Sequence, residues 1–211
     1  MIMTDSNQKK ILILFAHPAF EKSRVNKQLV NAVKSIEGVH FHDLYEAYPE
    51  YLIDIKQEQE LLSSHDIIIF HHPFFWYSTP AILKEWQDLV LEHGWAYGSK
   101  GNELKGKILL NVITTGGQET AYHPDGYNHF TVRQLLAPIE QTAYLCKMTF
   151  LPPFLVHGTH SITSAEIDQY IKEYRELLLA LVENRVDLDA AGKLNRINDP
   201  EAKVIHHYEI S

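Results

Sequence analysis

The residues at the start of one predicted helix could hold an anion. Ser23, Arg24 and Asn26 lie where a helical pattern begins, and His17 lies just before them, after an apolar run. Free N–H groups and the helix dipole favour a bound phosphate at such a position. Spacing alone favours the simpler interpretation that Ser23 is an N-cap. The stretch has no glycine, which a Rossmann dinucleotide turn would need, and the chain has no P-loop motif.

A run of aromatic side chains forms the second candidate site, after a different apolar run. Left in a polar loop, these rings would expose a large apolar patch. Stacking on a flat ring system would explain them, whereas a hydrophobic plug beneath the following helix should explain at least one. The residues of this loop are Pro73, Phe74, Phe75, Trp76, Tyr77 and Ser78.

Two hydroxyls followed by two glycines form the third candidate site. Glycines let the backbone approach a ligand closely and present its N–H groups. The alternative is a simple turn that needs a positive φ. Tyr122 follows this turn, and is either a proton donor over the same site or a packed tyrosine at its rim. The residues of the turn are Thr114, Thr115, Gly116 and Gly117.

Short apolar runs alternate with longer helical patterns along the chain, which is typical of βαβ units around a parallel sheet. Pro138 should kink or split a helix over 130–145. Two prolines in a strand over 148–156 should make the end of that strand leave the ladder. The other strands are predicted at 11–16, 39–44, 66–70 and 108–114, and the other helices at 23–37, 55–64, 80–90 and 167–182.

This alternation and the chain length favour an α/β fold of the flavodoxin-like kind. It is a three-layer sandwich around a five-stranded parallel sheet with the order 2-1-3-4-5. We expect residues 1–185 to form this domain, and residues 186–211 to be a polar C-terminal extension, not a separate domain. Ligands of such a sheet bind outside the carboxyl ends of its strands, where the three loops should meet. Together the loops suit a phosphorylated planar cofactor, with flavin the natural candidate.

Composition and charge describe one soluble globular domain. Of 211 residues, 45% are hydrophobic and 22% are charged, which is ordinary for such a domain. The net charge of -8 argues against nucleic acid or an anionic membrane as a general partner. The single cysteine, Cys146, allows no intrachain disulfide and should be a buried small hydrophobic residue. The apolar run at 11–16 is too short for a signal peptide or a membrane span, so we expect a cytoplasmic protein.

The chain has 13 histidines, but no spacing typical of a metal site. His71 and His72 are adjacent near the end of a predicted strand, where successive side chains diverge and cannot easily share one ion. We therefore expect surface and supporting histidines, and no bound metal.

Several longer stretches resemble one known family. The chain is similar to the flavodoxin-fold NAD(P)H:quinone oxidoreductases, the group that includes DT-diaphorase. Within that group it resembles in particular the bacterial ancillary subunits of glutathione-regulated potassium-efflux systems. The matching stretches are Ala16–Pro18 with Ser23–Asn26, His72–Pro73 with Trp76–Tyr77 and Pro80, His93–Gly98, Thr114–Gly117, and Leu151–Phe154.

The resemblance implies a role for each of the three loops. The first loop would hold the phosphate and ribityl chain of the flavin, through His17, Ser23, Arg24, Val25 and Asn26. The second loop would line the edge of the isoalloxazine ring, through Pro73, Phe74, Phe75, Trp76 and Tyr77. The third loop would contact the dimethylbenzene and pyrimidine portions of the ring, through Thr114, Thr115, Gly116 and Gly117.

Tyr122 matches the active-site tyrosine of the quinone reductases in its spacing from the glycine pair. Those enzymes have a histidine six positions further on, where this chain has Asn128. A tyrosine–histidine relay is therefore not transferred whole. His123, His129 and solvent stay open as sources of the proton.

The resemblance also implies a reaction and its partners. The reaction is a ping-pong transfer of hydride from NAD(P)H through flavin N5 to a quinone. FMN is the expected cofactor, and FAD stays open. A homodimer is implied, with Trp95–Tyr97 as the candidate interface or pocket rim. It would lie in the cytoplasm, with a peripheral position at the inner face of the cell membrane left open.

Two other functions stay open. A regulatory ancillary subunit would dock on a potassium/proton antiporter with little turnover of its own. A flavodoxin-type electron carrier is the weaker alternative, because a carrier needs an exposed flavin and no nicotinamide pocket.

Overall fold

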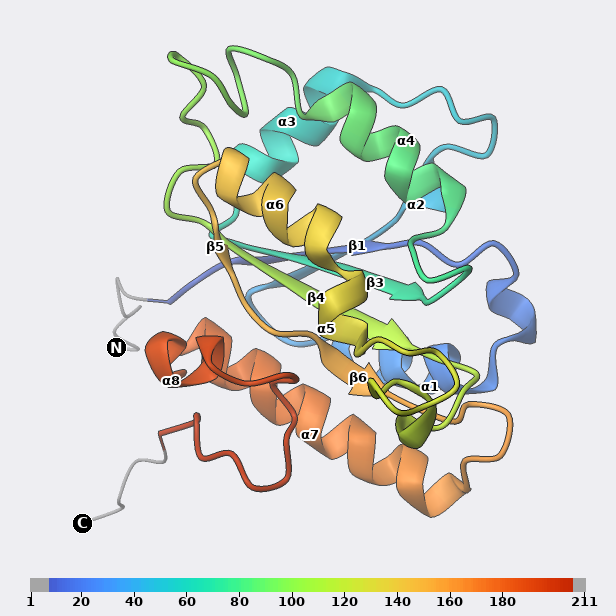
Figure 1. Ribbon diagram of the computed structural model, residues 1–211. Coiled ribbons are helices and arrows are strands. Elements are labelled where there is room, and N and C mark those ends of the chain that lie inside the picture. Colours follow the sequence, from blue (N-terminus) through green and yellow to red (C-terminus); the bar gives the residue numbers. More distant parts are fainter. Residues whose placement is uncertain (1–7, 207–211) are drawn as a thin grey trace, which may run out of the picture.

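A parallel sheet forms the middle of the molecule (Figure 1). The computed structural model describes residues 8–206, so residues 1–7 and 207–211 of the two predicted ranges lie outside the described residues. The strands are β1 (Ile11–Phe15), β2 (Val39–Asp43), β3 (Ile67–Pro73), β4 (Ile108–Thr114), β5 (Thr149–Phe150) and β6 (Phe154–Val156). Their order is β2-β1-β3-β4-β5, with β6 also on β4. This confirms the predicted flavodoxin-like α/β fold and its sheet order.

Burial on both faces explains the apolar runs of the central strands. Every residue of β1, β3 and β4 is buried, as expected of parallel strands covered on both sides. Strand β2 lies at an edge, and its residues are half-buried or exposed. Its alternating sequence predicts this position.

Pro152 and Pro153 interrupt the last strand in its middle. The Leu151 N–H still donates to Leu109 O at 2.9 Å, but proline has no N–H with which to continue the ladder. Pairing with β4 resumes at Phe154. The prediction that the end of this strand leaves the ladder is therefore wrong, because only its middle does.

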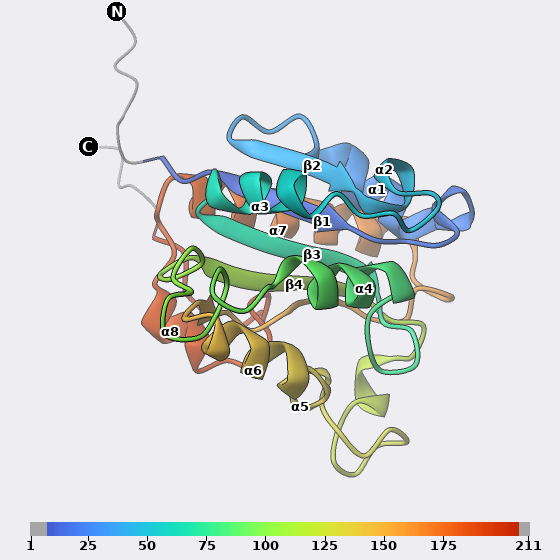
Figure 2. The same ribbon diagram turned by 90° about the horizontal axis from the view of Figure 1, so that it is seen from above.

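Helices cover both faces of the sheet (Figure 1, Figure 2). They are α1 (Arg24–Val33), α2 (Leu44–Ala47), α3 (Ile55–Ser63), α4 (Ala81–Val90), α5 (Val132–Leu135), α6 (Ala137–Leu145), α7 (Ser164–Val182) and α8 (Leu188–Gly192). Ile11 and Ile13 of β1 share a core cluster with α1 and α7. Leu12 and Leu14 share the other cluster with α3, α4 and α6, because successive strand side chains point to opposite faces. Within residues 8–206, no helix combines the length and apolar character needed to cross a membrane.

The predicted helix over 130–145 is split, as its proline indicates. Helix α5 ends at Leu135 and α6 begins at Ala137, with Pro138 in the first turn of α6, where a missing N–H interrupts no helical hydrogen bond. Cys146 follows α6 and is buried, as expected of a small hydrophobic residue. Burial raises the pKa of its thiol.

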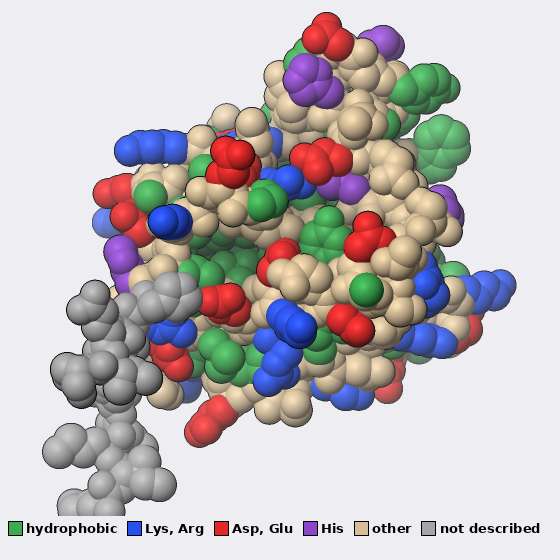
Figure 3. Space-filling view, turned by 90° about the horizontal axis from the view of Figure 1, so that it is seen from below, with side chains coloured by type: hydrophobic (Ala, Val, Ile, Leu, Met, Phe, Trp, Pro, Cys, Tyr) green, Lys and Arg blue, Asp and Glu red, His purple; other side chains and the backbone are tan. Residues whose placement is uncertain are grey.

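Residues 186–206, called here the C-terminal segment, pack against the core. Ala191, Ile197 and Val204 are buried in the same cluster as α7. The expectation of a polar tail is therefore wrong for this part of the chain, because scattered apolar residues are buried without any regular period. Figure 3 shows this face, where α7 and the C-terminal segment enclose a hollow of about 530 Å³.

Candidate functional site

The three predicted loops meet at one edge of the sheet. They follow β1, β3 and β4, which are neighbouring parallel strands. A cavity of about 400 Å³ opens between the loops, which is an ordinary volume for a small-molecule site. We call it the loop cavity. Its walls contain ten of the predicted cofactor residues, namely His17, Ser23, Arg24, Val25, Asn26, Pro73, Phe74, Phe75, Thr114 and Gly116.

The first loop places a helix N-terminus at the loop cavity. The hydroxyl of Ser23 accepts the Asn26 N–H at 3.2 Å, so Ser23 is the N-cap of α1. The first N–H groups of a helix have no partner within it, and the residues that carry them, Arg24 and Val25, line the cavity. Lys22 lies in the same wall. This end of the cavity thus offers N–H donors and positive charge to an anion.

The side chain of Asn26 connects the first loop to β3 and to the end of β4. Its amide nitrogen donates to the hydroxyl of Ser23 at 3.0 Å and to that of Thr114 at 3.1 Å. Both amide hydrogens are then used, so Asn26 Oδ1 accepts from His71 Nε2 at 3.2 Å. Asn26 is 2% exposed. A hydrogen bond donated by this amide to a ligand would require one of its two donated bonds to break.

His71 and His72 are fully buried, so of the surface and supporting positions expected for the histidines, neither of these two has the surface one. The reason is that β3 runs beyond Phe70 to Pro73, which carries both imidazoles into the interior. Burial lowers the pKa of His71 to about 3 and that of His72 to about 4, so both are neutral at pH 7. His71 supports the site by its bond to Asn26. Among residues 8–206, no group of three or more His, Cys, Asp or Glu is placed to hold a metal ion.

His17 presents an N–H donor in the wall of the loop cavity. Its Nδ1 accepts the Ala19 N–H at 3.2 Å, and burial lowers the pKa of the ring. A neutral imidazole that accepts at Nδ1 carries its proton on Nε2. The His17 ring centroid lies 6.1 Å from that of Phe75. His17 therefore lines the cavity beside the aromatic ring of Phe75.

The aromatic loop divides into one buried ring and three exposed rings. Phe74 is 8% exposed and packs in the core, which confirms the hydrophobic plug for that ring. Trp76 is 93% exposed, and Phe75 and Tyr77 are half-exposed. Trp76 and Tyr77 have φ angles of 49° and 62°, in the left-handed region that non-glycine residues rarely adopt. This turn leaves Trp76 and Tyr77 outside the walls of the loop cavity, whereas Phe75 lies in them.

The turn at residues 114–117 approaches the loop cavity through Gly116. A Cβ atom built at Gly116 would lie 2.7 Å from His160 Nε2, so a larger residue would displace His160 or fill the cavity. Thr115 and Gly117 do not line this cavity. The Thr115 hydroxyl donates to Gly117 O at 2.8 Å, which closes the turn on itself. Gly116 is thus the position where this backbone can come close to a ligand.

Four residues that the sequence did not single out also line the loop cavity. Ala19 and Lys22 complete the first loop, and Thr159 and His160 follow β6. Ligands of such a sheet bind outside the carboxyl ends of its strands, and the loop after the last strand also leaves from this edge. The fold therefore predicts that residues after the last strand line the cavity, although their residue types gave no sign of it.

The chemistry of the loop cavity fits a phosphorylated planar group. One end offers the N-terminus of α1, Lys22, Arg24 and the Nε2 hydrogen of His17, which are the donors that a phosphate needs. The other end offers the ring of Phe75 and the open backbone at Gly116. None of the described lining residues is acidic, so nothing in these walls repels an anion.

Tyr122 lies beside a second cavity, of about 580 Å³, which we call the tyrosine cavity. Its ring centroid is 6.1 Å from that of Phe74, which lines the loop cavity, and 5.6 Å from that of His157. Burial raises the pKa of Tyr122, and the nearby Tyr77 adds to the rise. The hydroxyl of Tyr122 therefore stays protonated at neutral pH.

His157 is the histidine beside Tyr122, and the sequence did not single it out. It is 8% exposed, and burial lowers its pKa to about 4. The Thr115 hydroxyl gives its hydrogen to Gly117 O, so His157 Nδ1 donates to Thr115 Oγ1, at 3.0 Å. The sequence feature that could have identified His157 as a site residue is its position directly after the last strand.

Asn128, which stands where the related enzymes have a histidine, accepts the hydroxyl of Tyr77 through Oδ1 at 3.1 Å. The two histidines that could substitute for it lie in the exposed part of the same loop. His123 and His129 are both exposed. Among the described residues, the rings that contact Tyr122 belong to Phe74 and His157.

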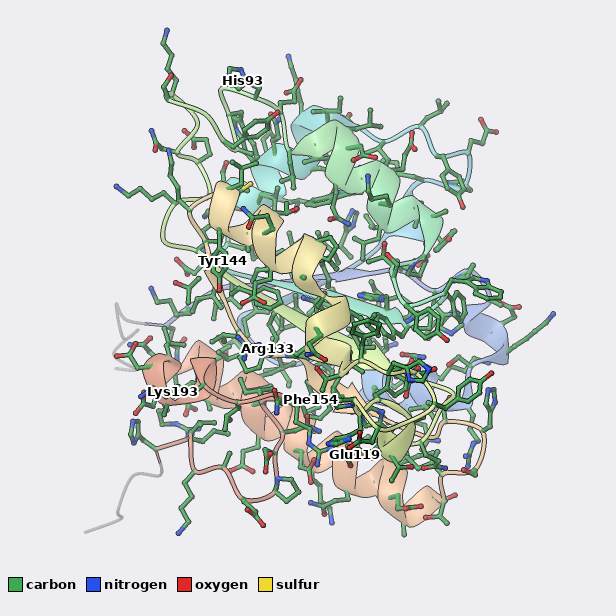
Figure 4. The ribbon with its side chains drawn as sticks, in the orientation of Figure 1. His93, Glu119, Arg133, Tyr144, Phe154 and Lys193 are labelled. Carbon is green, nitrogen blue, oxygen red and sulfur yellow. The ribbon has the colours of Figure 1, made fainter. Side chains whose placement is uncertain are left out.

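Residues 95–97 do not line the loop cavity of their own chain. They belong to the loop after α4, and Figure 4 shows His93 of that loop at the opposite end of the molecule from Glu119. Trp95 lines a shallow depression with Lys56 and Gln59 of α3. A place for these residues at a subunit interface stays a prediction.

Comparison with known proteins adds to this geometry. The chain matches the family model described as flavodoxin-like fold over residues 9–178. The glutathione-regulated potassium-efflux system ancillary protein KefG of Pectobacterium carotovorum subsp. carotovorum is 44% identical over 173 residues, which are 82% of this chain and 94% of that protein.

Two solved structures are similar in both sequence and shape. General stress protein 14 from Treponema denticola, solved in complex with FMN, is 37% identical with a TM-score of 0.78, over 82% of this chain and 99% of that one. An NADPH-quinone reductase from P. pentosaceus is 31% identical with a TM-score of 0.73, over 80% of this chain and 96% of that one.

Proposed function

This chain belongs to the family of proteins with the flavodoxin-like fold, and we propose that it is an FMN-dependent NAD(P)H:quinone oxidoreductase. The observation that carries the proposal is the loop cavity, which has N–H donors and positive charge at one end and an aromatic ring with open backbone at the other. FMN is supported by the similar structure from Treponema denticola, which was solved with it. The quinone and the nicotinamide are supported by the similar NADPH-quinone reductase.

The residues of the loop cavity divide the work of holding the cofactor. The N-terminus of α1, Lys22, Arg24 and His17 Nε2 would bind the phosphate, and Phe75 with the Gly116 backbone would bind the ring edge. Bound FMN would supply the two-electron redox chemistry between NAD(P)H and a quinone. Asn26 would position the first loop through its bonds to Thr114 at the end of β4 and to His71 of β3.

Tyr122 is the proposed proton donor, with His157 as its support. The raised pKa of Tyr122 keeps its hydroxyl protonated at neutral pH. The hydroxyl can then donate its proton to a negative charge that develops nearby. His157 packs against the Tyr122 ring and anchors the turn through Thr115. We assign the supporting place to His157 because its ring contacts Tyr122, whereas Asn128 bonds to Tyr77.

Replacing Tyr122 with phenylalanine tests this assignment. Tyr122→Phe should lower kcat about a hundredfold, the usual contribution of a positioned acid, and leave FMN affinity almost unchanged. Tyr127→Phe is the matched control, because Tyr127 lies in the same loop and is 86% exposed. Equal rates for Tyr122→Phe and the wild type would remove Tyr122 from the mechanism.

The function itself is tested by following the flavin absorbance of the FMN-loaded protein in two separate steps. Anaerobic NADPH or NADH should bleach the flavin band, and a quinone added afterwards should restore it. A protein that retains no flavin contradicts the proposal. The mass of the released cofactor distinguishes FMN from FAD.

Regulation of an antiporter is the second candidate function, and the 44% identity with KefG favours it. A chain of this kind would dock, as a homodimer, on a potassium/proton antiporter at the inner face of the membrane. A yellow protein that NAD(P)H does not reduce, but that sediments with vesicles containing the antiporter, would favour this function over the enzyme. Light scattering of the purified protein tests the homodimer.

A further inference from the structure

The C-terminal segment lines the tyrosine cavity. The family match ends at residue 178, so this segment lies beyond the part of the chain that the family shares. Asn195, Arg196 and Asp199 of the segment line the cavity together with Tyr122 and His157. The C-terminal segment, which lies outside the family match, thus lines the same cavity as the proposed proton donor Tyr122.

Side chains hold the C-terminal segment against the edge of the sheet. Asn198 bonds to both backbone groups of Leu155 in β6, accepting its N–H at 2.9 Å and donating to its C=O at 3.0 Å. Arg133 of α5 lies between the sheet edge and α8 (Figure 4) and donates to Gly192 O at 3.0 Å. The segment therefore covers an edge strand that would otherwise be open, and it has a defined position from which a side chain can act.

Arg196 reaches from the C-terminal segment to the loop that carries Tyr122. Its Nη1 lies 2.9 Å from Glu119 Oε2, and the Arg196 side chain is 15% exposed. Glu119 begins the short 3-10 helix η2 (Glu119–Ala121), and its carbonyl accepts the Tyr122 N–H at 2.9 Å. An ion pair and one backbone hydrogen bond therefore connect Arg196 to Tyr122.

The loop at residues 118–130 has few other contacts to hold it. None of its residues is fully buried, although the Tyr122 ring packs against the core at Phe74 and His157, so the backbone around that ring depends largely on specific bonds. Gln118 Nε2 donates to Ser161 Oγ at 2.7 Å, and Asn128 accepts from Tyr77. These two bonds lie near the ends of the loop, whereas the ion pair from Arg196 acts close to Tyr122.

We propose that Arg196 is a positioning residue of the redox site, which holds Glu119 and through it sets where Tyr122 lies. The C-terminal segment then contributes to the functional site through Arg196. The expected effect of Arg196 on kcat rests on the proposed function. The expected effect of Arg196 on the position of the loop does not depend on turnover.

Arg196→Ala in the FMN-loaded full-length protein tests the effect on the loop. Hydrogen exchange of peptides from residues 118–130 should become about fivefold faster, as expected for loss of a partly exposed ion pair. Arg196→Lys should keep most of the protection. Lys193→Ala is the matched control, because Lys193 is an exposed charge on the same segment, away from Glu119 (Figure 4), and does not line the tyrosine cavity. Unchanged exchange in Arg196→Ala, or the same change in Lys193→Ala, would overturn the proposal.

A double-mutant cycle with Tyr122→Phe tests whether Arg196 acts through Tyr122. Arg196→Ala alone should lower kcat with a quinone about fivefold and leave FMN affinity within about twofold of the wild type. In the Tyr122→Phe background the same change should have almost no further effect on kcat, because its target is gone. Additive losses would overturn the proposal. A wild-type protein without quinone turnover would contradict the proposed function instead, since the exchange measurement would still report on the loop.

Discussion

Lowering the pH from 7 to 5 should reduce the free energy of unfolding by roughly 6 kcal/mol, a large share of the roughly 5–15 kcal/mol typical of a folded domain. Three buried histidines produce this effect. Burial lowers the pKa of His71 to about 3, and it lowers those of His72 and His157 to about 4. The folded state therefore holds all three imidazoles neutral at both pH values.

The unfolded chain behaves differently, because its imidazoles regain a pKa near 6.5. Below that pH the unfolded state binds protons that the folded state does not, so acidification favours unfolding. Each histidine contributes roughly 2 kcal/mol to the loss by pH 5. The loss continues until the pH falls to the pKa of each histidine in the folded state.

Urea unfolding at pH 7, 6 and 5, followed by circular dichroism, measures this dependence. His72→Phe keeps an aromatic ring at the position and should reduce the pH-dependent loss by about a third. His123→Ala is the control substitution, because the side chain of His123 is 64% exposed. Equal unfolding free energies at pH 7 and pH 5 would show that these histidines are not buried in the neutral form.

Asn26→Leu should weaken FMN binding about a hundredfold, the factor that corresponds to roughly 3 kcal/mol. Leucine has a similar size but no amide, so Thr114 loses its donor and the buried His71 N–H loses its acceptor. Each unpaired buried polar group costs roughly 1–3 kcal/mol. The start of α1 would then lose the bonds that hold it to β3 and to the end of β4 beside the phosphate site.

Fluorescence titration of the apoprotein with FMN measures the change in affinity, and urea unfolding measures the accompanying loss of stability. Asn31→Leu is the matched control, because Asn31 lies on the same helix and is exposed. It should bind FMN like the wild type. If both variants bind FMN equally well, the connection through Asn26 does not organise the site.

Local sequence patterns predicted most of the elements around the site. The apolar run at β1 and the run at β4 predicted buried strands, because neighbouring helices cover both faces of a parallel sheet. Ser23 predicted the start of α1, because its hydroxyl can accept a backbone N–H three residues further on. Each of these signals acts over a few neighbouring residues, so the sequence carries it directly.

The sheet order then determined that loops far apart in the chain share one cavity. The positions of β1, β3 and β4 bring His17, Phe75 and Gly116 into the same walls. The alternation of strands and helices was enough to predict this, since the carboxyl ends of parallel strands meet at one edge. The sequence by itself therefore determined the elements, the sheet and the place of the candidate site.

Only the tertiary structure decided which side chains complete the site. His157 meets Thr115 across 42 positions of the chain, Arg196 meets Glu119 from a segment without regular period, and Trp76 turns away from the cavity through a left-handed backbone. These contacts depend on packing between distant segments. No local period or spacing encodes such packing, because it depends on how all the elements fill space together.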